Sequence, residues 1–211
     1  MVVGTVSQVG EQAFNVGRRA VLAAGFPERV PATTVDRQCG SSQQAVNFAA
    51  SGVIAGYHDI VIAGGVESMS RVPMFSNMVG GDGPFPPRML ERYDNGLVNQ
   101  GVSAEMIAER WGFSRTQLDE IAAASHARAA AAQRDGLFDE EILAIETPTG
   151  TVTQDQGIRP DTTVESLAGL KTPFLADGVV TAGNASQISD GSAALLITSS
   201  ERARELGLTP L

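Results

Sequence analysis

Hydrophobic and polar positions along the first third of the chain follow the periods of strands and helices in turn. Residues 1–9 have the pattern of a strand and turn, and residues 30–36 are β-branched and bounded by proline, as strands are. Between them, residues 16–24 carry apolar side chains at helical spacing. Residues 59–65 form a continuous apolar run, which is typical of a strand covered on both faces.

A second helix is expected between the last two of these strands, from Gly40 to Gly56. Its apolar residues have helical spacing, and Ser41 or Ser42 is available as the N-cap. The pattern predicts that this helix is mostly buried. Strand, helix and strand in this order indicate a βαβ unit with a right-handed crossover.

The pattern changes after residue 69. Residues 70–102 are rich in Pro, Gly, Met and Asn, which is typical of a loop but too long for a simple connection in a compact core. Beyond them the pattern predicts two helices, the second beginning at the capping signal Ser114 and Gln117. Two short strands and an irregular segment follow. The predicted helices span residues 103–112 and 114–136, the strands 140–148 and 150–154, and the irregular segment 155–178.

Residues 193–198 predict a strand that returns to the first sheet, and a short helix follows it. We therefore expect an α/β fold, a layered βαβ domain whose mixed sheet is covered by helices. Residues 1–69 and 191–211 form this domain, and residues 70–190 form an inserted α+β loop domain.

Composition and charge narrow the classes of function. The 211 residues carry a formal net charge of −9 without a basic patch, which argues against nucleic-acid and anionic membrane surfaces as partners. No apolar run approaches the roughly 18 to 20 residues of a membrane span, and no signal-peptide pattern opens the chain. We expect a cytoplasmic protein with no metal site and no intramolecular disulfide, since the two histidines lie far apart and there is one cysteine.

That cysteine, Cys39, lies where the predicted strand 30–36 gives way to a helix. Backbone N–H groups at a helix N-terminus stabilise a thiolate and can donate to an oxyanion, and Gly40 allows close approach of a ligand. A lone cysteine is also commonly a small buried hydrophobe. A nucleophile needs a base, and neither His58 nor His126 stands in a motif that marks one, so both interpretations stay open on these residues alone.

Five long stretches carry a family resemblance: VPATTVDRQCGSSQQAV, DIVIAGGVESMSRVPM, SAEMIAERWGFSRTQLDEIAAASHARAAAA, GIRPDTTVESLAGLK and VTAGNASQISDGSAALL. In this order they resemble the thiolases, the acetyl-CoA acyltransferase family, over nearly the whole chain. The resemblance implies a thiolase-like amino-terminal domain whose inserted loop domain binds coenzyme A.

The resemblance also implies the chemistry. Cys39 matches the family's nucleophile, which attacks the 3-keto carbonyl of a 3-ketoacyl-CoA, releases acetyl-CoA and keeps the shortened acyl chain as a thioester until free CoA removes it. The reverse reaction is a Claisen condensation. CoA and acyl-CoA are then substrates rather than bound cofactors, and the setting is lipid metabolism, such as fatty acid β-oxidation.

The contacts with CoA follow from the same resemblance. Arg159 and Ser166 match positions that hold the nucleotide end, and Ala182 and Ser186 match positions along the pantetheine. Taken alone, each of these residues is also an ordinary loop, helix or packing residue.

Three further positions stand out. Asn99 and Gln100 stand where many thiolases have a histidine and a methionine that contact pantetheine, which is a departure from the family pattern. Glu67 is interpreted as a hydrogen-bond partner beneath the site rather than as a catalyst.

A full thiolase is nearly twice as long, and its second half supplies an Asn-Glu-x-Phe motif, a Gly-His-Pro histidine and a second cysteine. We therefore expect a chain truncated at both ends that has little or no thiolysis by itself, and a homodimer or homotetramer in the full-length protein. The alternative is a non-catalytic CoA-binding or dimer-forming module. A ketoacyl synthase is disfavoured because those relatives share the fold but lack GGVESMS and TAGNAS.

Overall fold

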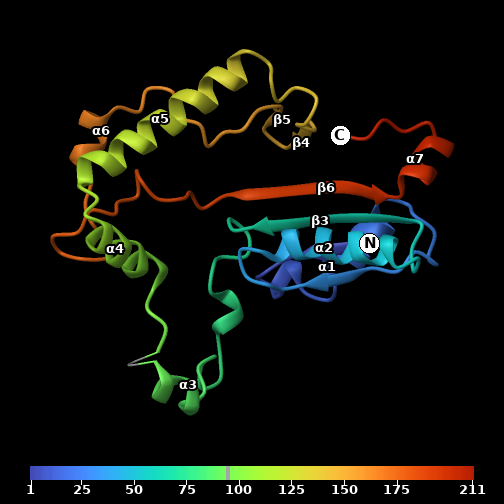
Figure 1. Cartoon of the computed structure of the whole chain (residues 1–211), viewed down its shortest axis with the longest axis horizontal. Coiled ribbons are helices and arrows are strands. Elements are labelled where there is room, and N and C mark those ends of the chain that lie inside the picture. The colour runs from blue at the N-terminus through green and yellow to red at the C-terminus, as the bar shows by residue number, and fades with distance from the viewer. Residues whose placement is uncertain (94–95) are drawn as a thin grey trace. The chain divides into compact units, whose positions relative to one another are not determined.

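The computed structural model describes residues 1–93 and 96–211, so residues 94–95 of the predicted irregular stretch lie outside the described part. The chain divides into two compact units. The first unit comprises Met1–Pro84 and Ile188–Leu211, and the second comprises Phe85–Gln187. Each unit contains its own β-sheet (Figure 1).

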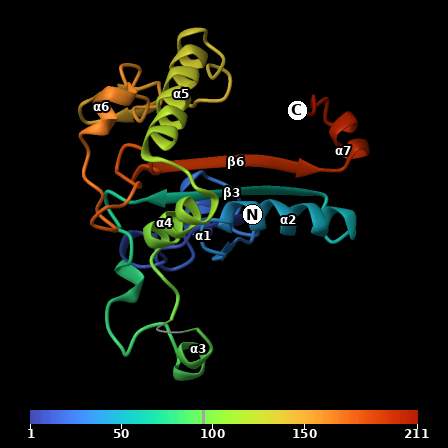
Figure 2. The ribbon, with the colours of Figure 1, turned by 60° about the vertical axis from the view of Figure 1, so that its left-hand side comes forward.

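The first unit is built on a four-stranded mixed sheet in the order β2-β1-β3-β6. The pairing of β1 with β2 and with β3 is parallel, whereas β3 and β6 are antiparallel and lie side by side along their full length (Figures 1 and 2). The predicted βαβ arrangement, the mixed sheet and the return of residues 193–198 to this sheet are confirmed. The strands are β1 (Val2–Gly4), β2 (Thr33–Val35), β3 (Ile60–Ser68) and β6 (Asp190–Thr198).

Helix α2 (Ser41–Ile54) covers the sheet with one face only. Its Ala49 joins Val61 and Ala63 of β3 in the core of the unit. The prediction of a mostly buried helix is wrong, because only Ser41, Ala45 and Ala49 are buried and Phe48 is 52% exposed. The remaining elements of the unit are η1 (Gly10–Gln12), α1 (Val16–Ala23), η2 (Ser76–Met78) and α7 (Ser200–Glu205).

The regular secondary structure of the second unit is mainly helical. The capping box that the sequence predicts is present, since Ser114 accepts from the backbone of Gln117 and the Gln117 side chain accepts in return. The short helices α3 and α6 lie within stretches expected to be irregular, and both predicted short strands form a hairpin. The elements are α3 (Pro87–Arg92), α4 (Gln100–Trp111), α5 (Arg115–Arg134), β4 (Ile145–Thr147), β5 (Gly150–Val152) and α6 (Val164–Ala168).

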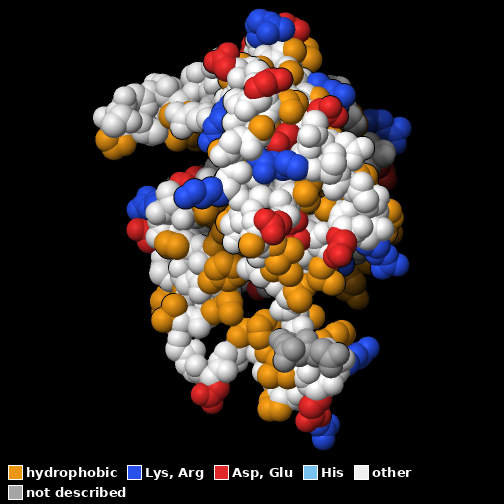
Figure 3. All heavy atoms as spheres, turned by 90° about the vertical axis from the view of Figure 1, so that its left-hand side faces the viewer, with side chains coloured by type: hydrophobic (Ala, Val, Ile, Leu, Met, Phe, Trp, Pro, Cys, Tyr) orange, Lys and Arg blue, Asp and Glu red, His pale blue; other side chains and the backbone are white. Residues whose placement is uncertain are grey.

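Hydrophobic side chains gather over α3 and α4 on the face shown in Figure 3. The exposed apolar side chains of these two helices include Leu90, Met106 and Ile107, each at least 40% exposed. No helix among the described residues is both long and apolar enough to cross a membrane.

The two ends of the predicted insertion are joined within the first unit. The backbone N–H and the Oγ of Ser70 donate to the carboxylate of Asp190, at 2.9 and 2.5 Å. Residues 70–84 and 188–190 therefore extend the first unit, while the second unit begins at Phe85.

Candidate functional site

Cys39 lies in the turn between β2 and α2, and its side chain is exposed. This excludes the interpretation of the residue as a buried filler. The preceding residue, Gln38, has a φ of 50°, which is uncommon for any residue other than glycine. This backbone conformation costs free energy, which contacts with the surrounding residues must offset. Gly40 is the N-cap of α2 and supplies no side chain to cover the thiol.

Ser41 braces this turn. Its Oγ accepts a hydrogen bond from the N–H of Arg37 at 2.9 Å and donates to the carbonyl of Gln38 at 2.6 Å. The N–H of Gln38 donates to Asp36 Oδ1 at 2.7 Å. The prediction that Ser41 or Ser42 is the N-cap is wrong, because both residues are already helical and the Ser41 hydroxyl serves the turn instead.

The amino-terminal end of α2 sets the electrostatics around Cys39. The helix has 14 residues with no acidic side chain in its first turn, so nothing there offsets the partial positive charge of its N-terminus. The backbone of Cys39 forms an isolated β-bridge with that of Arg37. The helix N-terminus beside it can stabilise an anionic oxygen.

His58, the histidine of the first unit, does not supply a base at this turn. The N–H of His58 donates to the carbonyl of Gly52 at 3.3 Å, and its ring lies against the same glycine. Gly52 stands about 16 Å along α2 from Ser41, at 1.5 Å per residue. His126 belongs to the second unit.

Two glycines let the first turn of α2 lie directly on the sheet. A Cβ on Gly4 would overlap the backbone of Ser41 and Ser42, and a Cβ on Gly65 would overlap the Ser42 hydroxyl and lie 2.9 Å from the carbonyl oxygen of Gly4. The first turn of α2, next to Cys39, therefore packs directly on the backbone of β1 and β3. Sequence reasoning missed both glycines, although each interrupts a strand of larger apolar residues.

Glu67, at the end of β3, anchors the loop that follows β1. Its carboxylate accepts from the N–H groups of Val6 and Ser7 at 2.9 and 3.2 Å and from Gln12 Nε2 at 2.8 Å. Partial burial favours the protonated form, but donation from Gln12 and from the two backbone groups outweighs it and lowers the pKa of Glu67. The expected role as a hydrogen-bond partner matches these contacts.

The four residues expected to contact CoA all belong to the second unit, and all four are exposed: Arg159, Ser166, Ala182 and Ser186. The Ser166 hydroxyl already has a structural task, because it donates to the carbonyl of Thr163 at 2.8 Å and closes a capping box at the start of α6.

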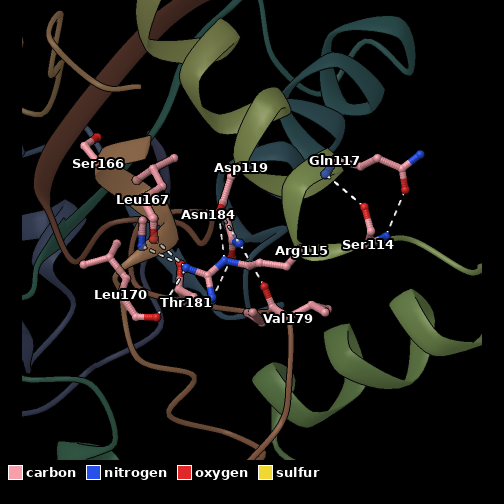
Figure 4. A network of polar contacts seen from close by, with 12 residues as sticks. Ser114, Arg115, Gln117, Asp119, Ser166, Leu167, Leu170, Val179, Thr181 and Asn184 are labelled. Atoms are coloured by element: carbon pink, nitrogen blue, oxygen red, sulfur yellow. Dashed lines mark hydrogen bonds and ion pairs between the residues drawn. The ribbon is translucent and has the colours of Figure 1, made fainter. Parts of the chain in front are cut away.

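Arg115 ties α5 to the end of α6 (Figure 4). Its Nε donates to Asp119 Oδ2 at 2.8 Å, one helical turn along, and Asp119 is only 1% exposed. A terminal nitrogen of Arg115 donates to the carbonyls of Leu167 and Leu170. The ion pair thus fixes the segment that follows Ser166.

Asn184 extends this network to the segment that carries Ala182 (Figure 4). Its Nδ2 donates to Asp119 Oδ1 and to the carbonyl of Val179, both at 2.9 Å, and its Oδ1 accepts from the N–H of Thr181 at 2.8 Å. Asn184 thus joins α5 to residues 179–181.

Glu105 of α4 holds the same segment from another side. It is 4% exposed and accepts from the N–H groups of Val179 and Val180, each at 2.8 Å. Sequence reasoning missed this residue. The signal was its spacing, because Glu105 lies on the same helical face as the buried Gly101 and Ala108.

Asn99 serves as the N-cap of α4, and its Oδ1 accepts from the N–H of Gly101 at 2.8 Å. Asn99, which stands where a pantetheine contact was expected, therefore has a structural role. No group of three or more metal-ligating side chains occurs among residues 1–93 and 96–211.

Comparison with known proteins places these features in context. The family model described as thiolase, N-terminal domain, matches residues 1–201. A steroid 3-ketoacyl-CoA thiolase of Mycobacterium tuberculosis is 42% identical over 217 residues, which cover 100% of this chain and 53% of that protein.

Two further relatives also have the names of a thiolase and an acyltransferase. A 3-ketoacyl-CoA thiolase of Aeromonas hydrophila is 44% identical over 98% of this chain and 54% of its own length. A probable acetyl-CoA acyltransferase of Staphylococcus epidermidis is 38% identical over 100% of this chain and 57% of its own length. The chain spans about half the length of the curated relatives it matches.

Proposed function

Because the chain belongs to the thiolase family and matches its amino-terminal domain, we propose that it transfers acyl groups between coenzyme A and Cys39. The observation that carries this proposal is the turn itself. It exposes the thiol at the amino-terminal end of α2, next to the left-handed Gln38 that the Ser41 hydroxyl braces.

In the degradative direction the Cys39 thiolate attacks the C3 carbonyl carbon of a 3-ketoacyl-CoA. The C2–C3 bond breaks, its electron pair stays on C2, and C2 takes a proton to give acetyl-CoA. The shortened acyl group remains on Sγ as a thioester, and the thiolate of a second CoA displaces it. The helix N-terminus favours both the attacking thiolate and the oxyanion that forms at C3.

The second unit binds CoA in this proposal. Arg159 and Ser166 hold the nucleotide end, while Ala182 and Ser186 line the pantetheine. The exposure of all four residues supports this assignment, as does the Asp119 network, which ties the segments of Ser166 and Ala182 to α5. An arginine offers a permanent charge and several donors to a phosphate. CoA acts as a substrate.

The biological setting follows from the reaction. We place it in the breakdown of lipid acyl chains, such as fatty acid β-oxidation, in the cytoplasm. The names of the relatives, which describe 3-ketoacyl-CoA thiolases, support this direction. We also propose a homodimer or homotetramer for the full-length protein, which the exposed Leu196 on the edge strand β6 supports.

The chain by itself is proposed to accept an acyl group without sustained turnover. Thiolysis needs an acid and a base at the reacting carbon atoms, and His58, the one histidine of the unit that carries Cys39, packs against Gly52 of α2 instead. Loss of one member of such a catalytic unit costs several orders of magnitude in rate.

The test is to incubate the 211-residue chain with acetyl-CoA and measure released CoA by chromatography. We expect one equivalent of CoA per chain, no further release, and no release from a Cys39→Ala variant. Binding of CoA without any release would favour the non-catalytic binding module. Thiolysis of acetoacetyl-CoA at an ordinary thiolase rate would refute the claim that the chain lacks turnover.

A further inference from the structure

Side chains from two other segments hold the loop that carries Arg159. The N–H of Arg159 donates to Nδ1 of His126 on α5 at 3.2 Å, across 33 positions in the sequence. Gln187 Nε2 donates to the carbonyl of Gly157 at 2.6 Å, across 30 positions. The loop is therefore fixed on both sides of Ile158 by partners that lie outside it.

The carbonyl of Arg159 is engaged as well. It accepts from the N–H of Thr162 at 3.2 Å and from its Oγ1 at 2.9 Å. With His126 on the N–H, both backbone polar groups of residue 159 are paired. The arginine side chain thus extends from a fixed backbone, although it is itself exposed.

These bonds also connect the residues proposed to bind CoA. Thr162 is adjacent to Thr163, whose side chain caps α6 and accepts from the N–H of Ser166 at 3.2 Å. Gln187 is adjacent to Ser186. The same few hydrogen bonds therefore set the spacing between the Arg159 loop, the start of α6 and the pantetheine segment.

We propose that His126 and Gln187 are positioning residues for CoA, and that they act through Arg159. The inference rests on the proposed function, since it takes Arg159 as the contact with the nucleotide end. A loop that is ordered before binding loses less conformational entropy when it meets a ligand, so removal of these bonds weakens binding without removing a ligand contact.

Four variants of the full chain separate this role from a general effect on folding. His126→Leu removes the acceptor, whereas His126→Asn keeps an acceptor oxygen near the place of Nδ1. Gln187→Met keeps the length of the side chain and removes the donor. Arg159→Ala removes the proposed contact itself. CoA affinity is measured by calorimetry, and thermal unfolding is followed by the fluorescence of Trp111.

We expect Arg159→Ala to weaken CoA binding most. His126→Leu and Gln187→Met should each weaken it about three- to tenfold, the effect of one lost hydrogen bond, and His126→Asn by less than about twofold. Added to Arg159→Ala, the His126→Leu change should cause no further loss, because both act through the same side chain.

Unchanged affinity in both His126→Leu and Gln187→Met would overturn the positioning role while the CoA site stands. Losses that add independently to that of Arg159→Ala would overturn it too, as would a His126→Asn variant as weak as His126→Leu. If the unaltered chain binds no CoA, or if Arg159→Ala binds it normally, the proposed site itself is refuted and the positioning role with it. Should His126→Leu not fold, the Gln187→Met and His126→Asn variants decide.

Discussion

Replacing Asp119 by alanine tests whether the buried network holds the second unit together. Asp119 is 1% exposed and accepts from Arg115 Nε at 2.8 Å and from Asn184 Nδ2 at 2.9 Å. Alanine removes both acceptors and leaves the guanidinium, whose side chain is 23% exposed, without its counter-charge. Its remaining partners are the carbonyls of Leu167 and Leu170.

The expected cost follows from these contacts. A hydrogen bond to a charged group contributes about 1.5 to 3 kcal/mol, and removing one partner of a buried ion pair costs about 3 to 5 kcal/mol. We therefore expect Asp119→Ala to lower the free energy of unfolding of the second unit by about 3 to 5 kcal/mol. Asp119→Asn keeps one acceptor without the charge and should cost about 1 to 3 kcal/mol.

The assay is urea unfolding followed by tryptophan fluorescence. Trp111 is the only tryptophan in the sequence and lies at the end of α4, so its signal reports the second unit rather than the first. Glu120→Ala is the matched control, because it removes an exposed carboxylate from the same helix and should change stability by less than about 0.5 kcal/mol. A loss below about 1 kcal/mol for Asp119→Ala would refute the reasoning.

Three further predictions concern the first unit. Gly4→Ala should lower the free energy of unfolding by about 1 to 3 kcal/mol, because a Cβ there overlaps the first turn of α2. Gly191→Ala, whose Cβ would meet no atom within 4 Å, should be nearly neutral, and urea unfolding followed by far-UV circular dichroism measures both variants. Ser41→Ala should lower the free energy of unfolding by about 1 to 2 kcal/mol, because it leaves the N–H of Arg37 without an acceptor. The same substitution should slow the acylation of Cys39, which mass spectrometry measures. The folded state lowers the pKa of Glu67, so the contribution of its carboxylate to stability is present above the usual pKa of 4.5 and is lost as the pH falls through the folded pKa. The difference in unfolding free energy between the wild type and Glu67→Gln should therefore shrink on acidification. A difference that does not depend on pH would contradict this assignment.

Local signals in the sequence predicted much of the fold. The Ser114 and Gln117 pair marked the start of α5, and the apolar run after Asp59 marked β3, because caps and strand burial are encoded by residues close together. Helices α3 and α6 escaped prediction. They have 6 and 5 residues, and they stand in Pro-rich and Gly-rich surroundings that do not show a helical period.

The candidate site was predictable only in its outline. The position of Cys39 before a helix follows from neighbouring residues, but the left-handed Gln38 that Ser41 braces depends on a fold already formed. The same holds for Glu105, which meets Val179 across 74 positions. The exposed face of α2 carries the polar residues Ser42, Gln43, Asn47 and Ser51, whereas the exposure of Phe48 and Ile54 could not be read from the pattern, because it does not say how many neighbours a helix has.

The central claim is that Cys39 accepts an acyl group from an acyl-CoA. The direct measurement is mass spectrometry of the chain after incubation with acetyl-CoA, with peptide mapping of the product. We predict a single acetyl thioester on Cys39 that disappears when free CoA is added. An unmodified Cys39 in a chain that binds CoA, or acetyl groups spread over other side chains, would contradict the claim.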